Sequence, residues 1–329
     1  MRQFTAYGVE GLYSDVRAHV PIDIKVSTCV SRFPSRGFFR RLYDVVRARR
    51  CQGDVNHVTG DIHFLTYLLA KSRTVLTILD CGTLERLRGF RRWLLWLLWY
   101  WLPEKRCTTI VVISEATRQQ VLRYLDCDEE KVKVIHCNVS NEFRAAPQAF
   151  NQSSPRLLLV GTTANKNIER TAQAVRGLKC QLVIIGQLSK PQLAALQSNG
   201  VDYENHVDIS REALVEQYRR CDMVVFASTY EGFGLPIVEG NAVGRPVVTG
   251  NITSMPEVAG DAACLVDPFD VANIRAGILR VMEDAVYREH LVERGFENVK
   301  RFRIEAVAGQ YAELYRKVYA QSKRPGPDT

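Results

Sequence analysis

The chain has 329 residues, of which 46% are hydrophobic and 24% charged, a composition that excludes a disordered chain and allows two domains of ordinary size. Its nine cysteines include no Cys-x-x-Cys pair, which argues against a disulfide framework or a zinc site and predicts free thiols in a reducing compartment. The polar start MRQFTAYGVE lacks the apolar segment of a signal peptide, so we expect a cytoplasmic protein.

The formal net charge of +8 lies entirely in the first half of the chain. Residues 1–150 hold 23 Lys and Arg against 15 Asp and Glu, whereas residues 151–329 hold 21 of each. The excess is densest in residues 32–50, where seven arginines stand against Asp44 alone. Such a stretch forms either a solvated helix face or a surface that attracts lipid head groups, phosphorylated ligands or nucleic acid. The sequence leaves both interpretations open.

The first half is predicted to mix helices and strands. It opens on a helix that places Phe4, Leu12 and Val16 on one face. A strand is expected next at 22–30, followed by a helix at 37–50. Further strands are expected from short apolar runs, with helical segments between them, at 54–60, 73–81, 108–114 and 131–137.

The longest apolar run is WLLWLLWYWL, residues 93–102. It is too short to cross a hydrocarbon core, which needs about 20 residues. One hypothesis is a helix in the membrane interface, where tryptophan and tyrosine gather and where the flanking arginines and lysine would meet lipid head groups. The other, which we favour, is a buried helix, because such helices are also apolar on every side.

The second half alternates strands and helices more regularly, after an aperiodic linker at 144–155. Helices are expected at 168–177, 190–198 and 211–220. Strands are expected at 156–161, 181–186, 203–207, 223–228, 245–250 and 263–268. Continuous apolar strands separated by helices indicate a parallel sheet covered on both faces. The two halves therefore predict an α/β protein with two doubly wound, Rossmann-like domains, whose ligand lies at the carboxyl ends of the strands.

The stretch EGFGLPIVE, residues 231–239, follows one of these strands and carries two glutamates around a glycine turn. Gly232 and Gly234 allow a tight turn, and Pro236 suits the first turn of a helix. The start of that helix can hold a diphosphate through its backbone N–H groups. Glu239 can then accept hydrogen bonds from ribose hydroxyls, with Glu231 on the other side of the diphosphate. This spacing favours a nucleotide-sugar as ligand, although a solvated glutamate beside a helix start would look the same.

The motif resembles the Glu-x7-Glu motif of family-four (group 1) retaining glycosyltransferases, which have the two-domain GT-B fold. GRPVVTGNITSMPEVAGDAACLVDP (244–268) is similar to the segment that follows this motif in the family. VGTTANKN (160–167) resembles the family's phosphate-contacting loop, and VVISEATRQQVLRYL (111–125) resembles the last part of its acceptor domain. The resemblance implies an acceptor-side domain at 1–147 and a nucleotide-sugar domain at 148–329, with a helix at about 303–320 that packs back on the first domain.

The resemblance also implies a role for each matched residue. Glu231 and Lys166 are expected to be catalytic, with Glu231 at the donor sugar and Lys166 at the departing diphosphate. Glu239 is expected to bind the ribose. The other expected substrate contacts come from several loops: Gly161, Thr162, Val207, Phe233, Gly234, Leu235, Asp80 and His57. No metal or other cofactor is expected, since the nucleotide-sugar is itself the donor substrate, and no nucleic acid is expected as a partner.

The sequence departs from the family pattern at three places. Leu79 stands before Asp80, where the family often has histidine, and Asn165 stands before Lys166, where many members have arginine. We expect the family's first strand and its glycine-rich loop to be absent from this sequence, because it opens on a predicted helix. These departures keep two functions open: a retaining hexosyltransferase, or a catalytically impaired relative that binds a nucleotide-sugar or a partner. A nucleotide-sugar epimerase is a third alternative that the glutamate motif disfavours.

Two histidines follow in DVNHVTGDIH, residues 54–63. His57 and His63 lie at the end of a predicted strand, close in sequence to Asp54 and Asp61. An acceptor contact and a local turn held by side-chain hydrogen bonds are both compatible with this pattern. A metal site is disfavoured, because no third ligand has suitable spacing. The acceptor itself is not identified by the sequence; an anionic or membrane-associated molecule would suit the basic first half.

Overall fold

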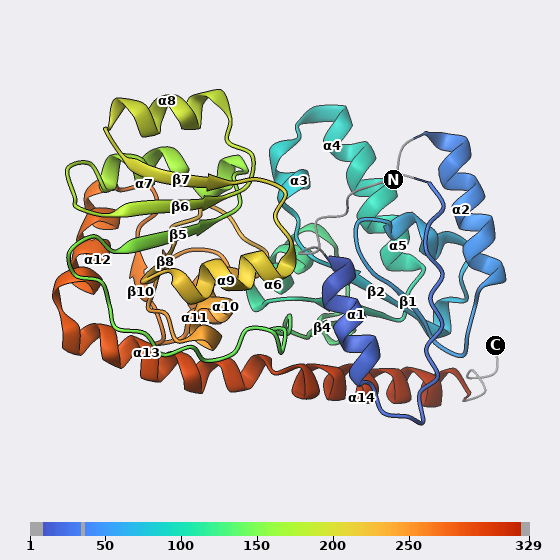
Figure 1. The fold of residues 1–329 in the computed structure, drawn as a ribbon. Coiled ribbons are helices and arrows are strands. Elements are labelled where there is room, and N and C mark those ends of the chain that lie inside the picture. The colour runs from blue at the N-terminus through green and yellow to red at the C-terminus, as the bar shows by residue number, and fades with distance from the viewer. Residues whose placement is uncertain (1–8, 34–36, 324–329) are drawn as a thin grey trace. The chain divides into compact units, whose positions relative to one another are not determined.

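The computed structural model describes residues 9–33 and 37–323 (Figure 1). The described chain forms two compact units. Unit 1 contains residues 137–304, and unit 2 contains residues 9–136 and 305–323. The last helix, α14 (Ile304–Ser322), lies almost wholly in unit 2, where Tyr311 contacts Tyr13 of the first helix. The described part of the predicted helix at the start is α1 (Val9–His19), and Phe4 lies outside the described residues.

Unit 1 is a six-stranded parallel sheet in the order β10-β9-β8-β5-β6-β7. Its strands are β5 (Arg156–Val160), β6 (Gln181–Ile185), β7 (Asp202–His206), β8 (Met223–Phe226), β9 (Val247–Gly250) and β10 (Cys264–Val266). Its helices are α7 (Ile168–Ala174), α8 (Lys190–Ser198), α9 (Arg211–Arg220), α10 (Leu235–Val243), α11 (Met255–Ala259), α12 (Val271–Glu283) and α13 (Ala285–Val299). All six predicted strands and all three predicted helices of this half are present.

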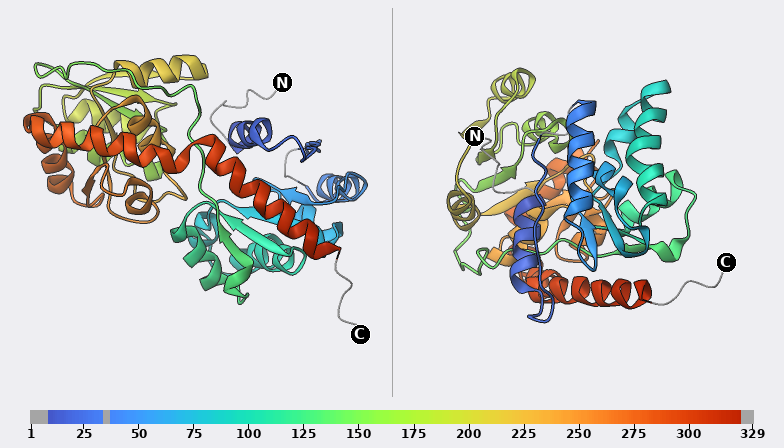
Figure 2. Two further views of the ribbon diagram at one scale, coloured as in Figure 1. Left: turned by 90° about the horizontal axis from the view of Figure 1, so that it is seen from below. Right: turned by 90° about the vertical axis from the view of Figure 1, so that its right-hand side faces the viewer.

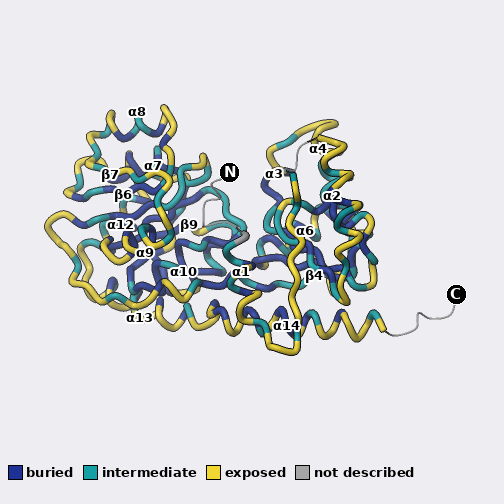
Figure 3. Tube along the Cα trace, turned by 45° about the vertical axis from the view of Figure 1, so that its right-hand side comes forward, coloured by how far each residue is buried: buried dark blue, intermediate teal, exposed yellow. Residues whose placement is uncertain are grey.

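The sheet of unit 1 is apolar because helices cover it. Residues of β5, β6 and β8 such as Leu157, Leu182 and Val225 are at most 2% exposed and share one core with Ile168 of α7 and Ile278 of α12. Figure 3 shows these strands in the colour of buried residues. Burial on both faces explains why β5, β6 and β8 are continuous apolar runs rather than alternating ones, whereas β7 at the sheet edge is polar and partly exposed.

Unit 2 has a four-stranded parallel sheet in the order β1-β2-β3-β4. The strands are β1 (Asn56–Val58), β2 (Thr74–Ile78), β3 (Thr109–Val112) and β4 (Val132–Val134). The helices, apart from α1 and α14, are α2 (Phe38–Arg50), α3 (Gly82–Arg86), α4 (Gly89–Leu95), α5 (Leu102–Lys105) and α6 (Glu115–Tyr124). A π-helical segment, Trp96–Trp101, joins α4 to α5. Among the described residues no strand precedes β1.

The strand predicted at 22–30 is wrong. These residues run without helix or strand assignment, and Ile22, Val26 and Val30 are exposed. Apolar residues at alternating positions predict a strand only when one face is buried and an edge is available for pairing. The first condition fails here, because these apolar side chains are exposed, and the segment makes no pairing with the free edge of β1, which is paired with β2 alone in the described sheet.

Candidate functional site: a carboxylate–lysine pair at the start of a helix

The loop between β8 and α10 is the centre of the candidate site in unit 1. Gly234 precedes α10 with φ 116°, a value that glycine adopts readily, and an added Cβ would lie 3.0 Å from the Ile237 Cδ1 atom. Pro236 occupies the first turn of α10, and Gly244 ends the helix with φ 81°. The N-terminus of α10 therefore directs the positive end of the helix dipole at this loop, as the sequence predicts.

The loop between β8 and α10 is held in place by hydrogen bonds from Thr253 and Ser254, which lie just before α11. The buried hydroxyl of Ser254 lies 3.0 Å from the Glu231 carbonyl oxygen and 2.6 Å from that of Phe233. The Glu231 backbone N–H donates to Thr253 Oγ1 over 3.3 Å. The ring of Phe233 is buried edge-on against Phe302, with centroids 5.5 Å apart. These contacts fix the backbone that carries Glu231 without using its carboxylate.

We predict that Ser254→Ala destabilises unit 1 by about 1–3 kcal/mol, because two buried carbonyl oxygens lose their hydroxyl partner. Urea unfolding measures this loss. Ser198→Ala, which changes an exposed serine of α8 in the same unit, is the control and is expected to leave the free energy of unfolding unchanged. An unchanged unfolding free energy for Ser254→Ala would show that the loop does not depend on this hydroxyl.

Lys166 and Glu231 form an ion pair in this loop. The Lys166 Nζ lies 2.7 Å from Glu231 Oε1, and their side chains are 18% and 14% exposed. Asn165 Nδ2 donates to the same carboxylate oxygen over 3.0 Å and to the Tyr230 carbonyl over 2.8 Å. The ammonium also lies 4.5 Å from the centroid of the Phe226 ring. The two residues predicted to be catalytic are thus brought together, and Asn165 is occupied in holding one of them.

The loop that carries Lys166 is shaped by glycine and asparagine. Gly161 has φ 92°, and a Cβ there would lie 2.8 Å from Lys166 Cε, so glycine leaves room for the lysine. Asn167, buried with φ 60°, donates from Nδ2 to the carbonyls of Ala227 (2.9 Å) and Pro268 (2.6 Å). Thr162 packs against Gly186 at the end of β6. Gly161, Thr162 and Lys166 therefore lie together at the carboxyl ends of β5 and β6.

Glu239 lies on α10, partly buried, and accepts a hydrogen bond from the buried Tyr218 hydroxyl of α9. Burial raises the pKa of the Glu239 carboxyl from 4.5 to about 7, and the Tyr218 bond and the positive charges of Arg211 and Lys166 oppose that rise. The same burial and the facing carboxylate raise the pKa of Tyr218. Among neighbouring candidates, Val207 follows β7 and is 39% exposed, and Leu235 opens α10.

Unit 2 holds the two remaining predicted residues, Asp80 and His57. Asp80 follows β2, and its Oδ1 accepts from the Gly82 N–H over 2.7 Å at the start of α3. Leu79, the departure from the family pattern, is partly buried beside it and offers no polar atom from its side chain. Asp80 therefore has a local role in the turn, and its predicted substrate contact stays a prediction.

His57 lies on β1 in a cluster of aromatic rings. Its Nδ1 is 2.8 Å from the Tyr315 hydroxyl, and its Nε2 is 2.7 Å from Thr77 Oγ1. Burial lowers the pKa of His57 to about 3, so the ring is neutral at physiological pH. His63 is buried too, and its Nδ1 lies 2.7 Å from the Trp99 carbonyl oxygen. Both histidines are thus held by hydrogen bonds to residues far away in the sequence, rather than within a local turn of residues 54–63.

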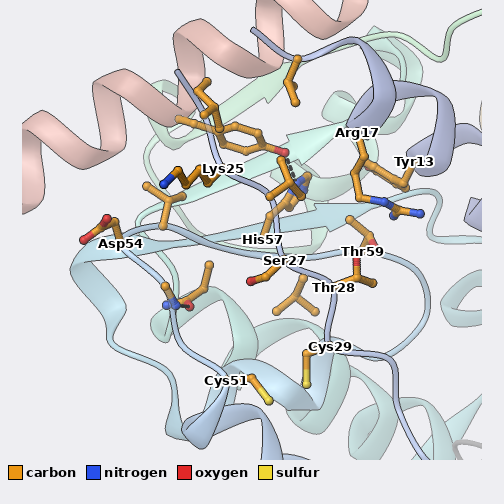
Figure 4. A pocket seen from close by; sticks show the side chains of 18 of the residues that line it. Tyr13, Arg17, Lys25, Ser27, Thr28, Cys29, Cys51, Asp54, His57 and Thr59 are labelled. Atoms are coloured by element: carbon orange, nitrogen blue, oxygen red, sulfur yellow. Dashed lines mark hydrogen bonds between the residues drawn. The ribbon is translucent and has the colours of Figure 1, made fainter. Parts of the chain in front are cut away.

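His57 also lines a cavity of about 680 Å³ that lies wholly in unit 2 (Figure 4). Arg17 and Lys25 reach its wall, as do hydroxyls of Ser27, Thr28 and Thr59. An acceptor contact for His57 through this cavity stays a prediction.

The sequence did not identify three residues that shape the site: Tyr218, Ser254 and Asn165 as a partner of Glu231. Each acts through a partner at least twenty positions away in the chain. The regular helix of residues 211–220 did place Tyr218 on the same apolar face as Leu214, but that pattern predicts burial and not the partner. Among the described residues, no group of three or more His, Cys, Asp or Glu side chains is arranged to hold a metal ion.

Two family models match the chain, and together they cover residues 5–298. Residues 5–143 match "Glycosyltransferase Family 4", and residues 140–298 match "Glycosyl transferases group 1". The second match includes Gly161, Lys166, Glu231 and Glu239, the residues assembled around α10.

Two kinds of Escherichia coli protein are similar in sequence. O-antigen chain mannosyltransferase B is 43% identical over 105 residues, which are 32% of this chain and 28% of that protein. A serotype-specific mannosyltransferase, WbdA, is 27% identical over 249 residues, which are 63% of this chain and 31% of that protein. This chain therefore spans about a third, or less, of the length of these relatives.

Solved structures show the same fold at low sequence identity. WaaG, described as a glycosyltransferase involved in lipopolysaccharide biosynthesis, has a TM-score of 0.71 at 13% identity, covering 95% of this chain and 97% of its own. HepE from Anabaena, solved with UDP and glucose, has a TM-score of 0.69 at 15% identity, covering 84% and 81%. With both sheets and both family matches in agreement, the chain belongs to the group 1, family-four glycosyltransferases of GT-B fold.

Proposed function

We propose that this protein transfers a hexose from a nucleoside-diphosphate sugar to an acceptor hydroxyl with retention of anomeric configuration. The observation that carries the proposal is the Lys166–Glu231 pair, 2.7 Å apart, in front of the α10 N-terminus. A cation and a helix N-terminus stabilise the negative charge that a departing diphosphate gains. A carboxylate beside them is placed to contact a sugar attached to that diphosphate.

The residues of unit 1 divide the donor between them. Glu239 accepts from the ribose hydroxyls, while the backbone at Phe233, Gly234 and Leu235 holds the diphosphate with Lys166. Val207 borders the base. The bond from the sugar C1 to the diphosphate breaks, and its electron pair goes to the diphosphate oxygen. A new bond joins C1 to the acceptor oxygen, whose proton passes to the departing diphosphate.

We base our proposal for the donor sugar and the biological setting on the relatives. The Escherichia coli relatives are named as mannosyltransferases, two of the names refer to O-antigen or serotype, and solved HepE carries UDP-glucose. Mannose and glucose donors therefore head the panel to be tested, with a glycan as product. We place the reaction in the cytoplasm, where the protein's nine free thiols remain reduced.

The test is nucleotide release from a panel of GDP- and UDP-sugars, with product anomers assigned by NMR after addition of a simple glycoside acceptor. We expect release with at least one donor and retained configuration in the product. Glu231→Gln is the control for the site. Donor binding in calorimetry without release or transfer from any donor would instead establish the impaired binding protein, for which Leu79 is the structural reason.

A further inference from the structure

The first turns of α2 and α4 leave large apolar side chains exposed in unit 2. On α2, Phe38 and Phe39 are 72% and 82% exposed; on α4, Phe90 and Trp93 are 72% and 50% exposed. The rings of each pair contact each other, with centroids 5.5 Å apart for the phenylalanines and 5.6 Å for Phe90 and Trp93. Single exposed apolar residues need no explanation, but four aromatic rings at two helix starts form a patch.

Both helix starts lie at the same end of unit 2. In Figure 1 and in the right-hand view of Figure 2, the chain enters α2 and α4 at the top and runs downward in both. α2 packs on the segment His63–Leu68, and Arg41 of α2 stacks 4.5 Å over the ring of Trp99, just beyond α4. The two helices therefore belong to one packed layer and present their aromatic tips on one side.

The rest of the WLLWLLWYWL run is not part of this exposed patch. Leu95, Trp96, Trp99 and Trp101 pack against the core of unit 2, and Trp96 Nε1 donates to the Tyr124 carbonyl over 2.8 Å. From residue 95 onward the run packs against the core but is only partly buried, with Tyr100 as its one buried residue, whereas Trp93 and Leu94 are exposed. Burial explains most of the run and leaves its first turn, together with Phe90, unexplained.

The charge around the tips is mainly positive, with exposed Glu85 of α3 as the acidic exception. Exposed arginines stand near both helix starts: Arg32, Arg40, Arg86, Arg88, Arg91 and Arg92. The one acidic residue within α2, Asp44, is buried and accepts from Ser31 Oγ over 2.6 Å and from the Arg32 N–H over 3.0 Å. α4 has no acidic residue. The buried Asp44 carboxylate thus adds no exposed negative charge that would repel an anionic partner.

We propose that these two helix starts, Phe38–Arg40 and Phe90–Trp93, form a surface that docks the protein on an anionic lipid bilayer. Phenylalanine and tryptophan side chains enter the interface of a bilayer, where their rings leave water. Arginines beside them stay at the level of the head groups and meet anionic phosphates. No helix of the described chain is long and apolar enough to cross a membrane, so the contact is peripheral. One part of this inference rests on the proposed function, namely that the acceptor is located at the same lipid surface.

The test is flotation of the whole protein with lipid vesicles. The assay contains no nucleotide-sugar, so its result is independent of whether the protein transfers a sugar. We expect flotation with phosphatidylcholine–phosphatidylglycerol vesicles at low salt, and weaker flotation with phosphatidylcholine alone or at high salt. Phe90→Ser with Trp93→Ser should weaken binding about tenfold or more, because two interfacial rings are lost. Arg40→Glu with Arg91→Glu should remove the preference for phosphatidylglycerol.

Matched controls lie on unit 1. The controls are Val286→Ser and Arg176→Glu. Val286 is 79% exposed and Arg176 is exposed, so these substitutions remove an apolar and a basic side chain away from the proposed surface and should leave flotation unchanged. Thermal unfolding midpoints and nucleotide affinity should match the parent protein in all variants, since every replaced side chain is exposed. The inference is overturned if the parent protein does not float at low salt, or if both double variants float as it does.

Discussion

Lys166→Met is expected to lower kcat/KM for the nucleotide-sugar by about 10²- to 10³-fold, because the departing diphosphate loses the ammonium that faces it in the proposed site. In the structure this ammonium is 2.7 Å from Glu231 Oε1 and 18% exposed. It is therefore poorly solvated and already partnered before any ligand arrives. We expect a bound diphosphate to interact with this ammonium, which the ion pair with Glu231 already holds in position. Steady-state kinetics of nucleotide release measures the loss.

The pair predicts opposite effects for its two partners on binding of the free nucleoside diphosphate. Lys166→Met should weaken that binding, because the cation is gone. Glu231→Gln should keep or strengthen it, since Lys166 is released from its carboxylate while Asn165 still has an amide oxygen to bond. Transfer should be lost in both variants. Isothermal calorimetry with the diphosphate alone separates these roles from each other.

Lys179→Met is the matched control, because Lys179 is an exposed lysine of the same unit. It should change neither diphosphate affinity nor turnover. If Glu231→Gln and Lys166→Met weaken binding of the nucleoside diphosphate equally, the two residues act as one structural unit. The proposal that Glu231 contacts the sugar and Lys166 the diphosphate would then be wrong.

The site was predictable from sequence where one short segment contains the geometry. Gly234, Pro236 and Glu239 belong to one turn and the helix that follows it, so spacing alone predicts the turn, the helix start and their order along the chain. Strands β5, β6 and β8 of unit 1 were predictable for a related reason: burial on both faces leaves unbroken apolar runs that end at glycine or a polar loop.

The parts that were not predictable depend on distant partners. Tyr218 reaches Glu239 from the preceding helix, and Ser254 reaches the Glu231 carbonyl from the loop after β9. No local pattern records such contacts. The segment 22–30 has an alternating apolar pattern, yet it forms no strand, and its side chains Ile22, Val26 and Val30 are exposed rather than buried on one face. The run 93–102 divides between core and surface, because hydrophobicity alone does not say which turn packs.

The pH dependence of nucleotide binding provides the second large effect. Glu239 has a pKa of about 7 in the free protein because of its burial, so a large fraction of this carboxyl is protonated at neutral pH. Two ribose hydroxyls that donate to it favour the ionised form. The ratio of parent to Glu239→Gln affinity for the nucleoside diphosphate should therefore fall about tenfold per pH unit below the pKa and level off above it. Titration calorimetry across that range measures the ratio, and the variant cancels the titration of the ligand itself.

The same carboxyl makes stability depend on pH in the opposite direction. A raised pKa means that the folded protein holds a proton the unfolded chain releases, so the free energy of unfolding falls as pH rises from 4.5 to about 7. At about 1.4 kcal/mol per pKa unit, the loss is on the order of 3 kcal/mol. Glu239→Gln should not show this loss, and its stability relative to the parent protein should grow over the same interval in urea unfolding.

Tyr218→Phe distinguishes burial from the hydrogen bond. The tyrosine hydroxyl lowers the pKa of Glu239, so its removal should move both the binding and the stability profiles to higher pH. A ribose contact through Glu239 requires both profiles to level off at the same pH, the pKa of this carboxyl in the free folded protein, because a single carboxyl governs both. If the affinity ratio is flat with pH while the stability difference follows the carboxyl, then Glu239 is a buried structural acid, and the ribose is bound by another group.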